Sequence, residues 1–172
     1  QAADLVGGLY LALGTAAGGD GLVGFEAGQR HTTTRLLDGE YPKVSSIFPS
    51  SSETESVVRT SDLVEAVKRV ALVAERNTAV QLAFDEGVLA LDAGSGDEAQ
   101  ASESIEASVK GDPITTGFNP TFLLDGLSAI DEDEVELAFT QASKPVVLSG
   151  CAAEGAEIPS FRYLLMPRRL LS

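Results

Sequence analysis

The stretch TSDLVEAVKRVALVAE, residues 60–75, predicts an amphipathic helix. Its apolar residues recur at the spacing of one helical face, and Thr60 or Ser61 can cap its start. The apolar stripe consists of Leu63, Val67, Val70 and Ala74, widened by Val64 and Ala71. The opposite face holds Glu65, Lys68, Arg69, Leu72 and Arg76. A leucine at the centre of this charged face makes it a candidate contact surface, with a plain solvent-exposed face as the alternative.

A second, shorter helix is predicted at PTFLLDGLSAI, residues 120–130. Asn119 stands at the capping position, and Pro120 stands at the first helical position, where no backbone donor is needed. Short alternating or β-branched runs bounded by Gly, Asp or Ser predict strands elsewhere, with turns at Asp85–Gly87 and Gly94–Gly96. These runs are YLALG (10–14), GLVGFEAG (21–28), RHTTTRLLDGEYP (30–42), VQLAFDEGVLALDAG (80–94), ESIEASVKGD (103–112), VELAFTQ (135–141), KPVVLSG (144–150) and FRYLLMP (161–167).

The order of these elements predicts an α+β fold with antiparallel sheets and two helices on one face. Residues 54–172 are expected to form one complete domain. Residues 1–53 contain a short helical segment at 3–8 and a few strands, too little to cover both faces of a sheet, and they end in a linker-like sequence. They are interpreted as the end of a preceding domain plus a linker, so the chain is expected to be part of a longer protein.

The chain is acidic, with 26 acidic and 12 basic residues and a formal net charge of −14. This charge argues against a protein that coats nucleic acid, since non-specific DNA binding depends on neutralising phosphates. The charges are unevenly spread, because the acids concentrate in residues 85–112 while residues 162–172 carry arginines and no acid. With no long apolar run, no export signal and a single cysteine, a cytoplasmic protein is expected.

Residues that could catalyse a reaction are few. His31, the only histidine, lies among threonines and is interpreted as an exposed strand residue, and Cys151 has no histidine near it in sequence. The acidic run Asp131–Glu134 lacks the spacing of a calcium loop, and the glycine clusters at 14–21 and 92–97 lack the lysine of a phosphate-binding loop. All three are interpreted as turns. We therefore expect no enzyme, no cofactor and no metal, with an enzyme of unrecognised site as the remaining alternative.

Three motifs occur in an order that resembles a known family: LLDGEYP (36–42), GFNPTFLLDGLSAI (117–130) and YLLMPRRL (163–170). Together they are similar to the bacterial sliding clamp, the β subunit of DNA polymerase III, and in detail to its actinobacterial members. The resemblance covers nearly the whole chain. It implies that each subunit has three similar α+β domains. Two such subunits would close head to tail into a ring around duplex DNA. The chain would hold the end of the middle domain and the complete third domain.

The same resemblance implies three sets of site residues. A hydrophobic cleft for a short motif of DNA polymerase III and other replication or repair proteins would include Pro42, Ile47, Asn119, Phe122, Ser143, Pro145, Leu164, Leu165, Met166, Pro167, Arg168, Arg169 and Leu170. Lys68 and Arg69 would face the DNA, which is encircled without sequence specificity. The interface of the homodimer, in the full-length protein, would include Leu72, Glu103 and Glu106.

Two functional hypotheses follow. The first is a processivity factor of DNA replication, with duplex DNA, DNA polymerase III and the clamp loader as implied partners. The alternative is a peptide-binding interaction scaffold unrelated to DNA. Retention on circular DNA that is lost when the DNA is linearised would separate the two.

Overall fold

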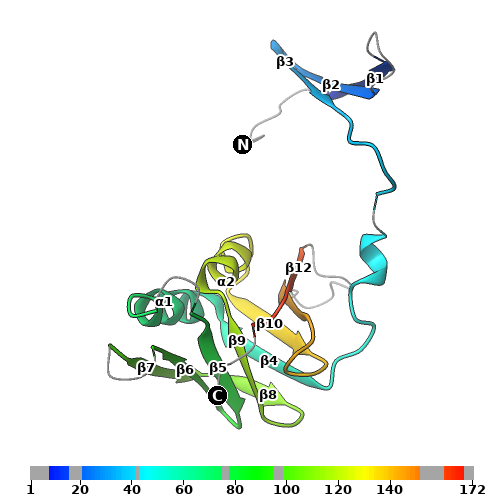
Figure 1. The fold of residues 1–172 in the computed structure, drawn as a ribbon. Helices are drawn as coiled ribbons and strands as arrows, with labels where there is room; N and C mark the ends of the chain where they lie inside the picture. Colours follow the sequence, from blue (N-terminus) through cyan, green and yellow to red (C-terminus); the bar gives the residue numbers. More distant parts are fainter. Residues whose placement is uncertain are drawn as a thin grey trace. The chain divides into compact units, whose positions relative to one another are not determined.

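The computed structural model describes residues 8–15, 21–41, 43–74, 78–94, 99–151 and 161–168, and it divides into two compact units, Gln1–Lys43 and Val44–Ser172 (Figure 1). In the first unit, β1 (Tyr10–Thr15), β2 (Gly21–Ala27) and β3 (Arg30–Arg35) form an antiparallel sheet. The strand predicted over residues 30–42 is too long. The ladder ends where β2 begins, with the N–H of Leu36 donating to the carbonyl of Gly21 at 2.8 Å.

The second unit contains two antiparallel sheets and two helices, which confirms the predicted α+β class. One sheet has the strand order β12-β11-β10-β4-β8 and the other has the order β7-β6-β5-β9. The helices α1 and α2 lie on the same side of the unit and contact each other (Figure 1). The elements are a 3-10 helix (Val44–Ser46), β4 (Thr54–Arg59), α1 (Thr60–Ala71), β5 (Val80–Asp85), β6 (Val88–Ala93), β7 (Ala101–Glu106), β8 (Ser108–Lys110), β9 (Ile114–Phe118), α2 (Pro120–Leu127), β10 (Glu134–Phe139), β11 (Val146–Gly150) and β12 (Arg162–Leu165).

The second unit is built from two halves with the same order of elements. The first half runs from β4 through α1 to β5, β6 and β7, and the second runs from β9 through α2 to β10, β11 and β12. Each half lends its leading strand to the other, because β4 pairs with β10 and β9 pairs with β5. This exchange interlocks the two sheets.

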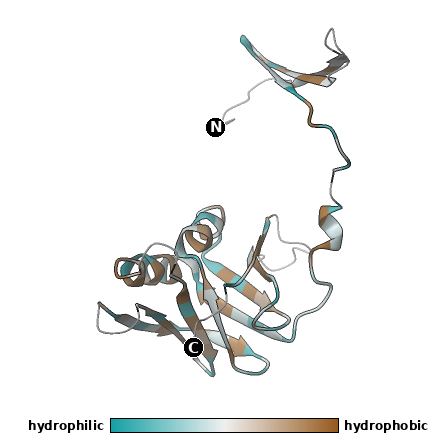
Figure 2. Cartoon of the chain, viewed as in Figure 1, coloured by the Kyte–Doolittle hydropathy of each residue, from teal (hydrophilic) through white to brown (hydrophobic). Residues whose placement is uncertain are grey.

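A repeated sequence lies at the centre of this exchange. The motif VQLAF (80–84) in β5 recurs as VELAF (135–139) in β10, so Phe84 and Phe139 occupy equivalent positions. Their ring centroids lie 4.9 Å apart, and both side chains are almost completely buried. Buried residues alternate with more exposed ones along these strands, and the buried ones are apolar, so each strand presents one apolar face to the core. Figure 2 shows the apolar residues of the sheets in brown. The two inner faces meet at the phenylalanine pair.

The start of α1 differs from the prediction. Neither Thr60 nor Ser61 caps the helix, because Arg59 holds the cap position without a side-chain hydrogen bond. Thr60 instead donates its backbone N–H to the carbonyl of Asp133 and its hydroxyl to the carbonyl of Glu132, both at 2.8 Å. The acidic run at 131–134, predicted as a turn, therefore holds the corner between β4 and α1.

The end of α1 also comes earlier than predicted. The helix ends at Ala71 rather than near residue 75, and residues 72–74 continue as tight turns with three-residue hydrogen bonds of 3.2–3.3 Å. The predicted stripe of Leu63, Val67 and Val70 is buried, together with Ala66, which the stripe did not include. The predicted apolar face is thus confirmed over the helix itself.

The cap of α2 is confirmed. The Asn119 side chain accepts the N–H of Thr121 at 2.9 Å, and Pro120 is the first helical residue. The helix ends at Leu127, before the predicted residue 130. A Cβ atom on Gly126 would lie 2.5 Å from the ring of Tyr163, so glycine lets α2 approach β12 closely.

The strands between β6 and α2 differ from the prediction. The strand β9 was not predicted, and the run at 103–112 is divided into β7 and β8. The division falls at Ala107, a buried residue whose N–H donates to the carbonyl of Gly87 at 3.2 Å. The turn at Asp85–Gly87 is confirmed, with Gly87 at a φ of 80°. Of the remaining predictions, the segment 3–8 and the turn at Gly94–Gly96 lie largely outside the described residues.

The phenylalanine pair generates a first prediction. We expect Phe84→Leu and Phe139→Leu each to lower the free energy of unfolding, and the double variant to lose about 0.5–1.5 kcal/mol less than the sum, because the ring contact is lost only once. Denaturant unfolding of the four proteins measures this coupling. Additive losses would contradict a central role for the ring contact.

The close approach of α2 to β12 generates a second. We expect Gly126→Ala to destabilise the protein by about 1–3 kcal/mol, although alanine favours helices, because the new methyl group collides with the Tyr163 ring. The same measurement on Thr121→Ala, at an exposed position of α2, is the control. A stabilising Gly126→Ala would show that the contact with Tyr163 relaxes without cost.

Candidate functional site

The described residues offer no catalytic or metal centre. His31 is exposed on β3, as predicted, with its Nδ1 atom 3.6 Å from an oxygen of Glu26. Burial raises the pKa of the Cys151 thiol, and nearby carboxylates, Glu134 first, add to the effect, so little of it is the nucleophilic thiolate at neutral pH. Within the described ranges no group of His, Cys, Asp or Glu could hold a metal ion. None of the described helices is long and apolar enough to span a bilayer.

A groove lies beside the C-terminal segment that follows β12. The backbone N–H of Arg168, the last described residue, donates to the carbonyl of Gly117 at 2.8 Å, and this bridge attaches the segment to β9. The hydroxyl of Thr116 donates to the carbonyl of Ala142 at 3.0 Å and holds the opposite wall. The groove measures about 510 Å³ and is lined by Thr115, Thr116, Gly117, Ala142, Ser143, Met166, Pro167 and Arg168.

Four predicted cleft residues therefore come together in this groove: Ser143, Met166, Pro167 and Arg168. The residues contributed by β9 were missed because that strand was not predicted. The sequence signals for them were their position just before the Asn119 cap and, for Gly117, its place at the start of the motif 117–130. The groove thus combines apolar atoms of Met166 and Pro167 with hydroxyl groups and one arginine.

The other predicted cleft residues are distributed around α2 and β12. Phe122 on α2 is 54% exposed, Met166 is 61% exposed and Ile47, after the 3-10 helix, is 55% exposed. Three large apolar side chains are therefore available to a partner. Leu165 instead faces the core, while Asn119, Pro145 and Leu164 are half-buried. The predicted residues Pro42, Arg169 and Leu170 lie outside the described residues.

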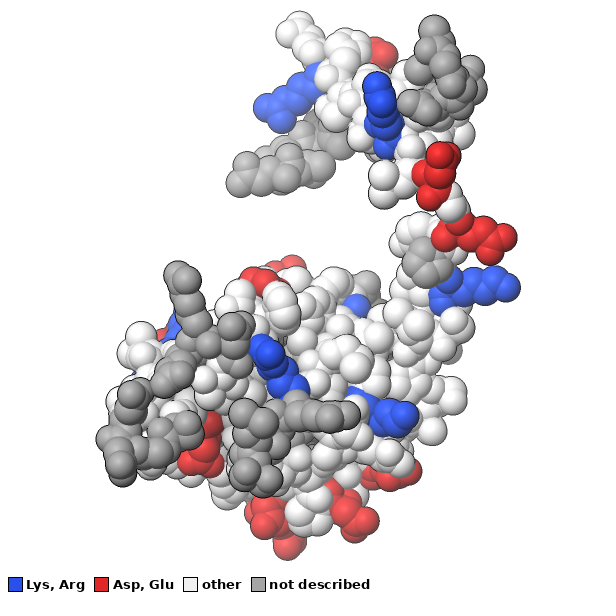
Figure 3. Space-filling view, viewed as in Figure 1, with Lys and Arg blue, Asp and Glu red and all other residues white. Residues whose placement is uncertain are grey.

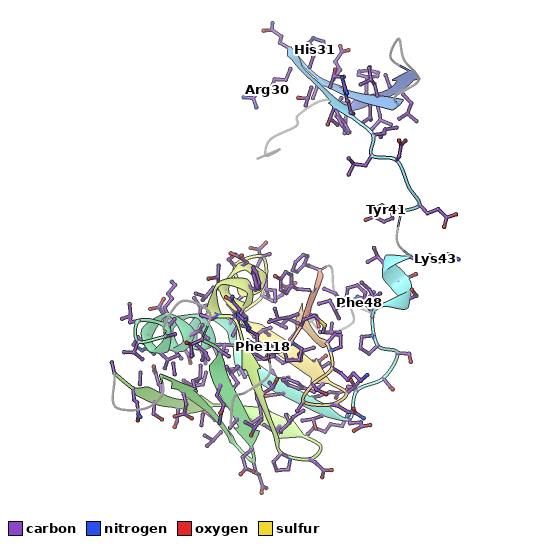
Figure 4. All side chains as sticks on the ribbon, viewed as in Figure 1. Arg30, His31, Tyr41, Lys43, Phe48 and Phe118 are labelled. Atoms are coloured by element: carbon purple, nitrogen blue, oxygen red, sulfur yellow. The ribbon has the colours of Figure 1, made fainter. Side chains whose placement is uncertain are left out.

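One contact near Ile47 was not predicted. The Arg162 guanidinium lies 4.7 Å from the ring centroid of Phe48, a cation–π contact between β12 and the segment that follows the 3-10 helix. Figure 4 labels Phe48 beside this segment. The contact joins Phe48, the residue after Ile47, to β12. An aromatic residue beside a predicted cleft residue was the only sequence signal for it.

The exposed face of α1 carries paired charges. The Lys68 ammonium lies 3.0 Å from a carboxylate oxygen of Glu65 on the same helix. The Arg69 guanidinium reaches β7, where its Nε atom lies 3.1 and 3.0 Å from the two carboxylate oxygens of Glu103 and its Nη2 atom makes a further contact. Hydrogen bonding to Arg69 lowers the pKa of Glu103, so the carboxylate stays charged at neutral pH.

Leu72 lies three residues beyond Arg69 and is 85% exposed. Glu106 is exposed at the end of β7, which is an edge strand of its sheet. The residues predicted to face DNA and those predicted at a subunit interface therefore adjoin each other, because Arg69 contacts Glu103 directly. The sequence contained no signal for this contact.

A family model described as DNA polymerase III beta subunit, C-terminal domain, matches residues 45–169. Among curated relatives, the beta sliding clamp of Streptomyces coelicolor is 55% identical over 163 residues, which are 94% of this chain and 43% of the relative. The beta sliding clamp homolog of Streptomyces muensis is 43% identical over 149 residues, or 86% of this chain and 40% of the relative. The chain thus spans about two fifths of the length of these relatives.

Solved structures agree with this match. The sliding clamp of Bartonella birtlesii bound to griselimycin has a TM-score of 0.77 and 26% identity, covering 87% of this chain and 39% of that one. The DNA polymerase III beta subunit of Thermotoga maritima has a TM-score of 0.76 and 27% identity, covering 87% and 40%. Since the family model covers most of the second unit and the Streptomyces match extends through the first, the chain belongs to the beta sliding clamp family.

Proposed function

We propose that this chain is part of a processivity factor of DNA replication, a ring-shaped clamp that encircles duplex DNA. The observation that carries the proposal is the 55% identity to the Streptomyces coelicolor clamp across 94% of the chain. In this proposal residues 1–53 are the end of the middle clamp domain plus a linker, and residues 54–172 are the third domain. The protein works in the cytoplasm without catalysing a reaction, and it uses no cofactor or metal.

The groove beside the C-terminal segment supports a docking role. Exposed Phe122, Met166 and Ile47 offer apolar surface, and the groove wall adds hydroxyl groups and Arg168. A short peptide that buries leucine and phenylalanine anchors gains about 1.5–3 kcal/mol from each, less the costs of association. DNA polymerase III, the clamp loader and other replication or repair proteins would bind through such peptides. Met166 suits varied partners because its side chain is flexible.

The remaining predicted site residues have roles in the proposed ring. Lys68 and Arg69 on α1 face the duplex, and they act as phosphate neighbours without reading bases. Leu72, Glu103 and Glu106 meet the partner subunit of the homodimer in the full-length protein. The exposure of Leu72 and the open edge of β7 support this assignment.

A peptide-binding scaffold unrelated to DNA is the second candidate. The net charge of −14 favours it, as do the carboxylate partners of Lys68 and Arg69. Acidic side chains also gather along the lower edge of the second unit in the view of Figure 3. The ring proposal also accommodates these charges, because they would keep the outer surface of a ring from binding nucleic acid.

Peptide titration tests the docking proposal. We expect a short peptide with leucine and phenylalanine anchors to bind this chain with a dissociation constant that is roughly micromolar or weaker. Met166→Ser should weaken binding about tenfold by removing apolar contact, while Val88→Ser, which alters an exposed apolar residue on β6, should not. Calorimetry on the three folded proteins measures the difference. Equal affinities of Met166→Ser and Val88→Ser would contradict the docking assignment.

Retention on DNA separates the two candidate functions. We expect a longer protein that carries this chain within a complete clamp, once loaded on circular duplex DNA, to resist high-salt washing and to be released when the DNA is cut. The reason is that a closed ring is held by topology, whereas ionic contacts are screened by salt. Gel filtration of the loaded DNA before and after cutting measures retention. Release by salt alone from uncut circles would favour the scaffold.

A further inference from the structure

The cationic side chains of α1 and its cap are all engaged with carboxylates. Arg59 lies 3.7 Å from Asp62, and Lys68 lies 3.0 Å from Glu65, in both cases within a single helical turn. Arg69 differs, because its partner Glu103 comes from another element, β7. Pairs within one exposed turn are weak and exchange readily with solvent. Arg69 is therefore the cation of this helix that is held by tertiary structure.

The geometry at Arg69 resembles that of an occupied oxyanion site. A guanidinium presents a planar fork of donors that fits either a carboxylate or a phosphate, and here Nε and Nη2 both point to Glu103. The Arg69 side chain is 54% exposed, so solvent and solutes can reach it, while the Glu103 side chain is only 25% exposed. A phosphate group that approached this fork would have to displace or share the donors that the carboxylate occupies.

The position of Glu103 connects this contact with the edge of the sheet. β7 pairs with β6 on one side and has no strand on its other side among the described residues. A basic strand that docked against the open edge would offer Glu103 a second cation. The Glu103 carboxylate would then be shared between the two cations or drawn away from Arg69. Either change leaves donors of the Arg69 guanidinium available to an anion.

We propose that Glu103 is an internal competitor for phosphate at Arg69, so that α1 contacts DNA more strongly when Glu103 is neutralised at the β7 edge. Subunit contact and DNA contact would thereby favour each other, since a coupling between two binding events acts equally in both directions. The inference rests on the proposed function, in which α1 faces duplex DNA. It gives Glu103, a residue of the predicted interface, a second role toward the predicted DNA-facing residue Arg69.

A matched pair of variants tests the competition. Glu103→Gln and Glu106→Gln each remove one negative charge from β7, but in this structure only Glu103 contacts Arg69 among the described residues. We expect Glu103→Gln to raise the affinity for a fluorescent duplex of about 20 base pairs several-fold more than Glu106→Gln does. Its plot of log affinity against log salt should steepen by about 0.9, the increment for one further phosphate contact. Anisotropy titrations at low salt measure both quantities.

A second variant guards against an indirect effect. Adding Arg69→Ala to Glu103→Gln should remove the gain in affinity, because the freed guanidinium is then absent. Equal affinities of Glu103→Gln and Glu106→Gln, or a gain that survives Arg69→Ala, would overturn the inference and leave the proposed function standing. No salt-dependent binding by any variant would overturn the inference together with the DNA-facing role of α1. Far-ultraviolet circular dichroism establishes that every variant is folded.

Discussion

The contact between Phe84 and Phe139 is the interaction on which the rest of the second unit depends. The two rings occupy the same place in two copies of a V-x-L-A-F strand, and the copies meet where the halves of the unit exchange their leading strands. Neither half can bury its apolar strand face alone, because each sheet contains a strand from the other half. The unit therefore folds as a whole, with α1 packed mainly against β7 and β6 and α2 packed against α1 and β12.

The repeat also explains why the C-terminal segment forms a groove. In the first half the chain returns from the edge strand β7 through Ala107 and forms β8, which makes three pairs with β4. In the second half the chain returns from β12 to β9 in the same way, and within the described residues, which end at Arg168, it makes one bridge, between Arg168 and Gly117. Pro167 has no N–H to extend this ladder. The last described segment therefore lies beside β9 as a wall of the groove instead of completing the sheet.

Sequence reasoning recovered the parts of the fold that local chemistry determines. The Asn119 cap, the Pro120 start and the apolar face of α1 follow from the residues themselves. The predicted cap of α1 was wrong because Thr60 donates hydrogen bonds to carbonyl groups more than seventy positions away in the sequence. Local sequence rules do not consider such distant partners. The short run that forms β9 contains a glycine and resembles a loop, and the groove residues on it were missed for the same reason. The Arg69–Glu103 contact, between residues 34 positions apart, depends on tertiary packing alone.

The acidic edge of β7 restricts the symmetry of any assembly that uses it. Two copies that met edge to edge about a two-fold axis at Ser104 would set Glu103 diagonally opposite its own counterpart, and an axis at Ile105 would do the same for Glu106. Such isologous pairing is opposed by like charges, whereas pairing with a different, basic edge is not. An edge of this kind therefore favours heterologous contacts and disfavours pairing with the same edge of a second copy. The same two glutamates thus discourage this edge from pairing with a copy of itself.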